Sequence, residues 1–195
     1  DMNDIGVTGS YLAKTVVRNI VPRDLDVIVY GREACVKLYR ALYKLRREGV
    51  TEPARARQFK PGSMSVNSWI RLAKTRILEG VFRGLEYSAR AVECTEEEPC
   101  TIRIEVAKRV KLAIEIIEHI SPFIMPYKYR ARVLEVAKDS EDVLGRGMII
   151  EVVSQRMRFS EIPLGTKLYV ETMLVYIDDK PVLDLDRPGT RAEVL

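Results

Sequence analysis

The chain divides into two halves that differ in how their apolar positions are spaced. From Ile102 to Ile116 apolar residues fall on alternate positions, interrupted only at Lys108, which favours a long or bent β-strand over a helix. Further strand-like segments follow at residues 127–137, 147–155, 167–177 and 180–186. Turn signals such as the Asp178-Asp179 pair separate them. Consecutive short strands of this kind predict a small all-β, barrel-like domain over residues 98–195.

The first half instead predicts strands that alternate with helices. A short strand ends at Gly9, a helix begins at Ser10, and a second strand occupies the apolar run at residues 24–30. A long helix follows at residues 32–49, and Cys35 falls on its apolar face, where we expect it to be a core residue. This half therefore combines helices with a sheet.

Two carboxylates share one side of the predicted strand at residues 24–30. Because successive side chains of a strand alternate between its faces, Asp24 and Asp26 point one way while Leu25 and Val27 point to the opposite core. Mutual repulsion makes such a pair costly alone and favourable around a hard divalent cation, which takes oxygen ligands and often also holds substrate phosphates. The pattern predicts a site for Mg²⁺ or Mn²⁺.

The Gly9-Ser10 pair predicts the complementary, phosphate-binding half of this site. Ser10 can cap the helix that begins there and donate to a γ-phosphate, and the free N–H groups of a helix N-terminus favour an anion. A Gly-Ser dipeptide or an Asp-x-Asp motif taken singly is more often an ordinary turn or a solvated strand end. The prediction therefore rests on their joint placement.

With these motifs the sequence resembles the nucleotidyltransferase superfamily of DNA polymerase β, and within it a group of archaeal nucleotidyltransferases. The resemblance rests on GVTGSYLAK, RDLDVIVYG and the helix REACVKLYRALYKLRREG, and extends to VFRGLEYSARAVE and VVSQRMRFSEIPLGTKLYVE. It implies an α+β fold, in which a nucleotidyltransferase-like α/β domain with a mixed sheet, at residues 1–97, precedes the β-rich domain. Because the chain begins at Asp1, almost directly in the first strand, we expect this domain to lack its N-terminal part.

The resemblance also implies roles for individual residues. Gly9, Ser10 and Lys14 would bind the nucleoside triphosphate (NTP), and Asp24 and Asp26 would bind two metal ions as catalytic residues.

The family has a third catalytic carboxylate, which belongs on the strand at residues 85–93. Ser88 stands in the corresponding register, and Glu86, two residues earlier on the same face, is the residue we expect to replace it.

Charge is unevenly distributed along the chain. Residues 1–90 carry 17 Lys and Arg against 9 Asp and Glu, a net charge of +8, whereas residues 91–195 carry 15 against 19, a net charge of −4. The first half is therefore the candidate surface for RNA or another nucleic acid. Within it, basic residues recur along one helix face at Lys37, Arg40, Lys44 and Arg47. A solvated stripe is the competing interpretation.

Two further groups of residues in the first half are candidates for phosphate or base contacts. A helix capped by Asn67 or Ser68 carries basic residues beside an apolar stripe that contains Trp69. The loop before it carries cations that can close on a triphosphate, at Arg55, Arg57 and Lys60.

In the second half, Arg156 and Arg158 lie beside Phe159 and combine cations with a stacking surface. The alternatives are that the β-rich domain braces the first domain or mediates a homodimer.

The remaining composition bears on the setting of the protein. No apolar run is long enough to cross a membrane and no signal segment opens the chain, so we expect a cytoplasmic protein without a membrane partner. Gln occurs only twice while Arg, Lys and Glu abound, which is typical of hyperthermophiles and fits an archaeal origin. Cys94 and Cys100 could close a disulfide around an acidic segment, and His119 is the only histidine, which argues against a Cys/His metal site.

The leading hypothesis is a metal-dependent nucleotidyltransferase that moves a nucleoside monophosphate from an NTP to a hydroxyl acceptor. The alternatives are a catalytically degenerate module that binds nucleotide or RNA, motivated by Ser88, and a purely structural protein.

Overall fold

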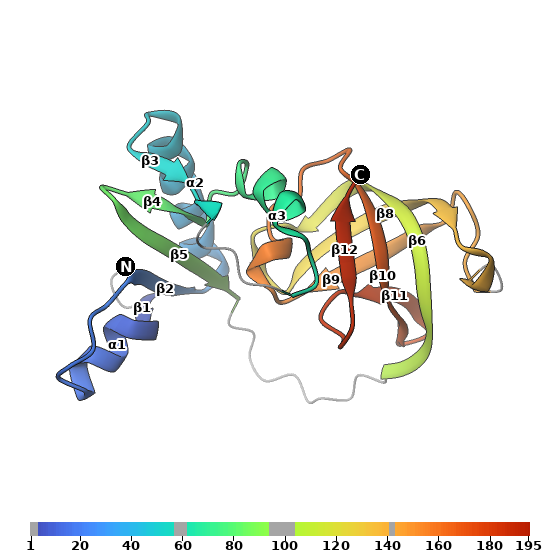
Figure 1. Cartoon of the computed structure of the whole chain (residues 1–195), viewed down its shortest axis with the longest axis horizontal. Helices are drawn as coiled ribbons and strands as arrows, with labels where there is room; N and C mark the ends of the chain where they lie inside the picture. Colours follow the sequence, from blue (N-terminus) through green and yellow to red (C-terminus); the bar gives the residue numbers. More distant parts are fainter. Residues whose placement is uncertain (1–3, 57–61, 94–103, 141–142) are drawn as a thin grey trace.

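The computed structural model describes residues 4–56, 62–93, 104–140 and 143–195, and shows an α+β protein built on two mixed sheets (Figure 1). The first sheet has the strand order β1-β2-β5-β4-β3, and β7 adds to β5. Its strands are β1 (Ile5–Thr8), β2 (Asp24–Tyr30), β3 (Thr51–Pro53), β4 (Glu79–Phe82), β5 (Leu85–Val92) and β7 (Ile124–Met125). Three helices accompany these strands: α1 (Gly9–Val16), α2 (Arg32–Arg47) and α3 (Val66–Ala73).

Helix α2 covers one face of the first sheet and leaves the other face free for polar residues. The small core beneath it contains Cys35, Val29 and Ala91, all at most 1% exposed. The thiol of Cys35 donates to the carbonyl oxygen of Val29 at 3.3 Å, so the prediction of a core cysteine is confirmed. Because side chains alternate along β2, burial of Val27 and Val29 against α2 places Asp24 and Asp26 on the opposite face.

The second sheet follows the order β11-β9-β8-β6-β10-β12, and a further pairing of β11 with β10 closes a ring. Its strands are β6 (Ile104–Ser121), β8 (Tyr127–Val136), β9 (Ile149–Ser154), β10 (Lys167–Ile177), β11 (Lys180–Asp184) and β12 (Arg191–Val194). All the strand segments predicted in this half are confirmed, as is the turn at Asp178-Asp179, where both residues have positive φ. Alternation did not predict which end of β6 is buried: Ile104 and Val106 are 53% and 50% exposed.

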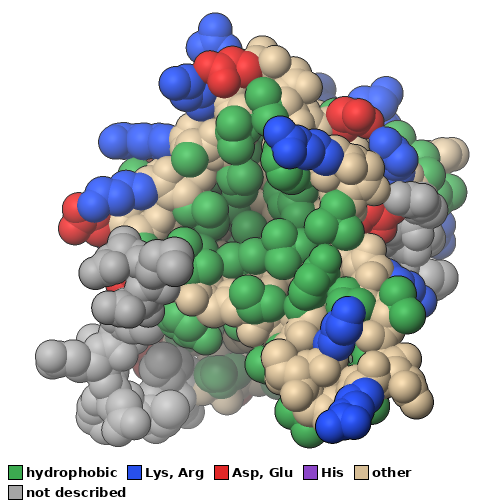
Figure 2. All heavy atoms as spheres, turned by 90° about the vertical axis from the view of Figure 1, so that its left-hand side faces the viewer, with side chains coloured by type: hydrophobic (Ala, Val, Ile, Leu, Met, Phe, Trp, Pro, Cys, Tyr) green, Lys and Arg blue, Asp and Glu red, His purple; other side chains and the backbone are tan. Residues whose placement is uncertain are grey.

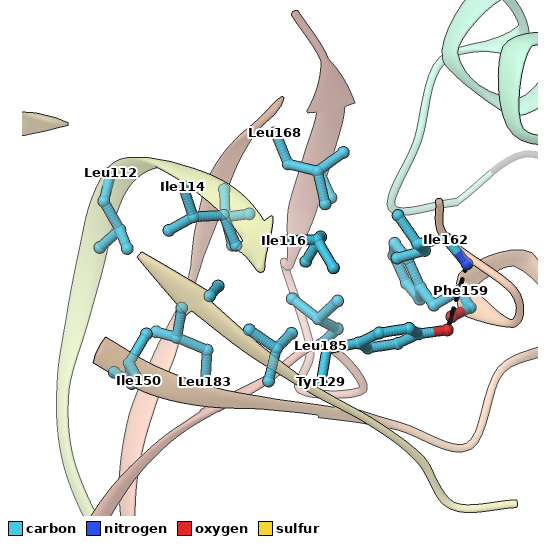
Figure 3. Close-up of a cluster of buried hydrophobic side chains, with 14 of the residues drawn as sticks. Leu112, Ile114, Ile116, Tyr129, Ile150, Phe159, Ile162, Leu168, Leu183 and Leu185 are labelled. Atoms are coloured by element: carbon cyan, nitrogen blue, oxygen red, sulfur yellow. Dashed lines mark hydrogen bonds between the residues drawn. The ribbon is translucent and has the colours of Figure 1, made fainter. Parts of the chain in front are cut away.

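The main hydrophobic core lies inside the second sheet (Figure 3). Tyr129 fastens the chain after β9 to this core, because its hydroxyl donates to the carbonyl oxygen of Phe159 at 2.7 Å and accepts from the N–H of Ile162 at 3.3 Å (Figure 3). Phe159, at the end of the short 3-10 helix η4 (Met157–Phe159), is fully buried. The position of η4 is therefore fixed by the core.

Each half of the chain contributes one element to the part of the fold that is built mainly by the other half. Helix α3, from the first half, packs into the core of the second sheet through Trp69 and Leu72, each 4% exposed. Strand β7, from the second half, pairs with β5 of the first sheet. The N-cap of α3 is Ser65, which accepts from the N–H of Ser68, so the expected cap at Asn67 or Ser68 is wrong.

The segment between α3 and β4 is bound from both sides. Arg46 of α2 donates to the carbonyl oxygens of Arg76 and Glu79, both at 3.0 Å. From the second half, the carboxylate of Glu161 accepts the N–H groups of Ile77 and Leu78 at 2.7 and 3.0 Å. These bonds hold the two sheets together through residues 76–79.

Among the described helices none is long and apolar enough to cross a membrane.

We predict that Glu161→Ala lowers the free energy of unfolding by about 1–3 kcal/mol for each backbone donor left unpaired, at Ile77 and at Leu78. Thermal or denaturant unfolding measures this loss. Ser154→Ala is the comparison variant, because Ser154 is also buried but its hydroxyl donates to the carboxylate of Asp186.

We predict that the stability of the Glu161→Gln variant depends on pH differently from that of the wild type. Burial raises the pKa of Glu161 above its ordinary value, against the opposing effect of the bonds from Leu78 and Ile77. A raised carboxyl pKa gives stability that is full below the unfolded value and is lost as the pH rises through the folded value. The amide does not titrate, so the stability of the Gln variant relative to the wild type should rise between about pH 4.5 and neutral pH, on top of a pH-independent loss from the one oxygen that no longer accepts an N–H. A relative stability that stays constant or falls as the pH rises contradicts this account.

Candidate functional site

A cleft of about 790 Å³ is lined by residues from both halves of the protein. The first sheet contributes its polar face, and the opposite wall comes from η4, the residues just before it and Asp186. The lining residues are Arg23, Asp24, Asp26, Trp69, Glu79, Glu86, Tyr87, Ser88, Arg90, Gln155, Arg156, Met157, Arg158 and Asp186.

Three predicted carboxylates meet in this cleft because β2 and β5 pair in parallel. Asp24 lies opposite Glu86 in the register, and Asp26 lies opposite Ser88. Neighbouring positions on paired strands project to the same face, so Asp24, Asp26 and Glu86 form one acidic patch. The hydroxyl of Ser88 donates to Oδ1 of Asp26 at 2.6 Å, which orients that carboxylate.

The turn at Gly9 lies directly against this patch. Gly9 has φ +65°, and a Cβ added there would stand 2.1 Å from Oδ2 of Asp26. A side chain at this position would be strained by the positive φ, and its Cβ would displace the Asp26 carboxylate. The hydroxyl of Ser10 donates to Oδ1 of Asp24 at 3.4 Å. The structure therefore brings the predicted Gly-Ser turn and both aspartates together.

Two details of the predicted turn differ. Thr8 is the N-cap of α1 and Ser10 lies inside the helix, so the expected capping role of Ser10 is wrong. Lys14 is exposed in the last turn of α1 and does not line the cleft. It stands apart because it lies a full turn further along α1 than Ser10.

Two carboxylates are enough to suit Mg²⁺, which usually keeps several waters and binds one or two carboxylates together with substrate phosphates. Asp24 and Asp26 supply such a pair. Within the described ranges no group of three or more His, Cys, Asp or Glu side chains is arranged to hold a metal. The residues present therefore fit an ion that is shared with a phosphate ligand rather than one enclosed by protein.

The opposite wall carries Arg156 and Arg158. Arg156 pairs with Asp186, Nε to Oδ1 at 3.4 Å, and its Nη2 donates to the carbonyl oxygen of Asp186 at 3.0 Å. Phe159 is fully buried, so the predicted stacking surface beside these arginines is wrong, although both arginines do line the cleft.

Sequence reasoning missed one acid that lines the cleft, Glu79 at the start of β4. It bonds Nη1 of the fully buried Arg76 at 2.5 Å, and Nη2 of Arg76 donates to the carbonyl oxygen of Arg158 at 2.8 Å. Its partner Arg76 stands only three residues earlier in the chain, but the sequence does not show that this arginine is buried.

The other basic candidates lie elsewhere. Lys37 and Lys44 on α2 are exposed and pair with Glu33 and Glu48. Arg55 pairs with Glu52 at 3.1 Å and does not line the cleft. The remaining loop cations, at 57 and 60, and the cysteines at 94 and 100 lie outside the described residues. The exposed position and the ion pairs of these α2 lysines are those of a solvated stripe, and no ligand is needed to explain them.

The side of the molecule on which α1 lies is largely apolar. Figure 2 shows hydrophobic side chains spread across this face. Residues of β1 and α1 that are exposed include Ile5, Val7, Leu12 and Val16. This face differs in character from the charged cleft.

We predict that Gly9→Ala displaces the Asp26 carboxylate and weakens Mn²⁺ binding by about 10–100-fold, the usual effect of disturbing the support of a metal ligand. Gly6→Ala is the matched control, because a Cβ there meets nothing closer than Tyr30 Cε2 at 3.7 Å. Titration of both variants with Mn²⁺, followed by electron paramagnetic resonance, measures the difference. Equal affinities in the two variants would mean that Gly9 does not shape the site.

In comparisons with protein-family models, curated proteins and solved structures, nothing matches this chain. The roles assigned below therefore rest on the geometry of the cleft and the chemistry of its side chains.

Proposed function

We propose that the protein is a metal-dependent nucleotidyltransferase that moves a nucleoside monophosphate from an NTP to a hydroxyl acceptor. The observation that carries this proposal is the contact between the Gly9-Ser10 turn and the aspartates of β2, with Glu86 in register beside Asp24. A phosphate-binding turn against a carboxylate pair is what a metal-bound triphosphate requires.

Each residue of the patch has a distinct role in this proposal. Asp24 and Asp26 hold the metal, which supplies charge neutralisation on the triphosphate when bound. Gly9 and Ser10 bind the phosphate tail through backbone N–H groups and the Ser10 hydroxyl. Glu86 accepts the proton of the acceptor hydroxyl as a general base. The Ser88 hydroxyl fixes the rotamer of Asp26 through its 2.6 Å bond.

A second candidate is a module that binds nucleotide or RNA without turnover. It is favoured by one observation: the position opposite Asp26 on β5 is Ser88, a hydroxyl, where a third carboxylate would enclose a metal. In this case the cleft retains phosphate recognition and lacks the strength of metal binding that catalysis needs.

We predict that Mg²⁺ strengthens NTP binding and that Asp24→Asn or Asp26→Asn abolishes this Mg²⁺-dependent gain while the fold is retained, because removal of one like charge relieves repulsion. Calorimetric titration with each NTP, with and without Mg²⁺, measures it. Asp179→Asn, an exposed turn position, removes the same charge away from the cleft and should bind as the wild type does. A Mg²⁺-dependent gain in affinity that survives in both cleft variants would refute the metal site.

We predict that Ser88→Asp raises Mn²⁺ affinity about tenfold, since affinity for hard cations follows the number of charged oxygen ligands. Ser88→Ala is the matched control, because it removes only the bond to Asp26. Pyrophosphate release distinguishes the two functions. Release by the wild type supports the enzyme, whereas release by the Ser88→Asp variant alone supports the degenerate module.

A further inference from the structure

The two walls of the cleft carry opposite net charge, and the acids that could neutralise the arginines of the η4 wall are already bound. Glu79, at the start of β4 in the first sheet, is paired with the buried Arg76 at 2.5 Å. Asp186 accepts from the Ser154 hydroxyl at 2.7 Å and from the N–H of Gln155 at 2.6 Å, besides its pair with Arg156. Little negative charge is left on this wall to neutralise a further cation.

Arg158 is that further cation. Its Nη1 atom is buried and has no hydrogen-bond partner within the described part of the chain. Burial lowers the pKa of Arg158, and the neighbouring Arg156 lowers it further; Glu79 opposes this shift, and Arg76 adds a smaller lowering. A desolvated guanidinium beside two other cations is costly unless an anion binds it.

The backbone holds this guanidinium in place. A Cβ added at Gly62 would stand 2.7 Å from Nη1 and 3.2 Å from Cζ of Arg158, so the glycine lies directly against the guanidinium. On the other side of the residue, the carbonyl oxygen of Arg158 accepts from Arg76 at 2.8 Å, and Phe159 is anchored in the core. Arg158 is therefore positioned before any ligand arrives, which reduces the entropy lost on binding.

We infer that Arg156 and Arg158 form a phosphate-binding subsite on the wall opposite the aspartates, so that the substrate is held by both halves of the protein. A guanidinium fork matches phosphate oxygens in bidentate geometry, and an anion in the cleft that Arg156 and Arg158 line would offset the excess positive charge there. The inference deepens the proposed function, on which it rests, because it assigns the second wall of the same cleft.

The test is calorimetric titration with tripolyphosphate in the presence of a chelator at low ionic strength, where no metal contributes. We predict that Arg158→Gln weakens this binding about tenfold, as loss of a charge-assisted pair does. Arg158→Lys should recover only part of the loss, because lysine keeps the charge but not the fork. Arg146→Gln, outside the cleft lining, should bind as the wild type does.

Folding and binding are separated by a thermal melt without ligand. Removal of a desolvated cation should leave the melting temperature of Arg158→Gln equal to or above that of the wild type. Arg156→Gln provides a second variant with its own expected loss of affinity. Wild-type affinity for tripolyphosphate in both variants would overturn the inference.

Two comparisons complete the design. If tripolyphosphate binding depends on Arg158 while Mg²⁺-dependent NTP binding is absent, the subsite is supported and the proposed function is refuted. If Mg²⁺-dependent NTP binding is present while tripolyphosphate binding does not depend on Arg158, only the subsite is refuted. Competition identifies the source of the phosphate: displacement by Mg²⁺-NTP assigns the subsite to the nucleotide, and simultaneous binding assigns it to a phosphorylated acceptor.

Discussion

The structure depends on how the segment at residues 76–79 is held. Its backbone carbonyls are bound by Arg46 from α2, and its N–H groups by Glu161 from the loop that follows η4. A buried segment must satisfy these groups somewhere, and here each half of the protein satisfies part of them. The same segment leads into β4, which pairs with β5, and carries Arg76, which bonds the carbonyl of Arg158. The positions of the two walls of the cleft therefore depend on the same group of hydrogen bonds.

The aspartate pair of β2 was predictable because it follows from a local rule. In β2 the alternation of Asp24, Leu25, Asp26 and Val27 determines which side chains share a face, whatever the strand packs against. The Gly9-Ser10 turn was predictable for the same reason, as the end of a strand and the start of a helix. The long alternating segments of the second half, such as β10 at Lys167–Ile177, also followed from local pattern.

The rest depends on contacts between residues far apart in the sequence. Glu161 and Arg46 look like ordinary charged residues in the sequence, and only the fold makes one of them a buried acceptor and the other a bridge between backbone carbonyls. Strand β7 has two residues and no periodicity to detect. The sequence shows the charge of Arg158. It does not show that Nη1 of Arg158 is buried without a hydrogen-bond partner against Gly62, which lies more than ninety positions earlier in the chain.

The central claim is that the aspartates of β2 and the Gly9-Ser10 turn hold one metal-bound triphosphate. Diffraction from crystals grown with Mn²⁺ and a non-hydrolysable NTP tests this most directly, because the anomalous signal of Mn²⁺ locates the ion. The account predicts Mn²⁺ between the carboxylates of Asp24 and Asp26, with the triphosphate against Gly9 and Ser10. Mn²⁺ elsewhere, or a nucleotide bound outside the cleft, would contradict it.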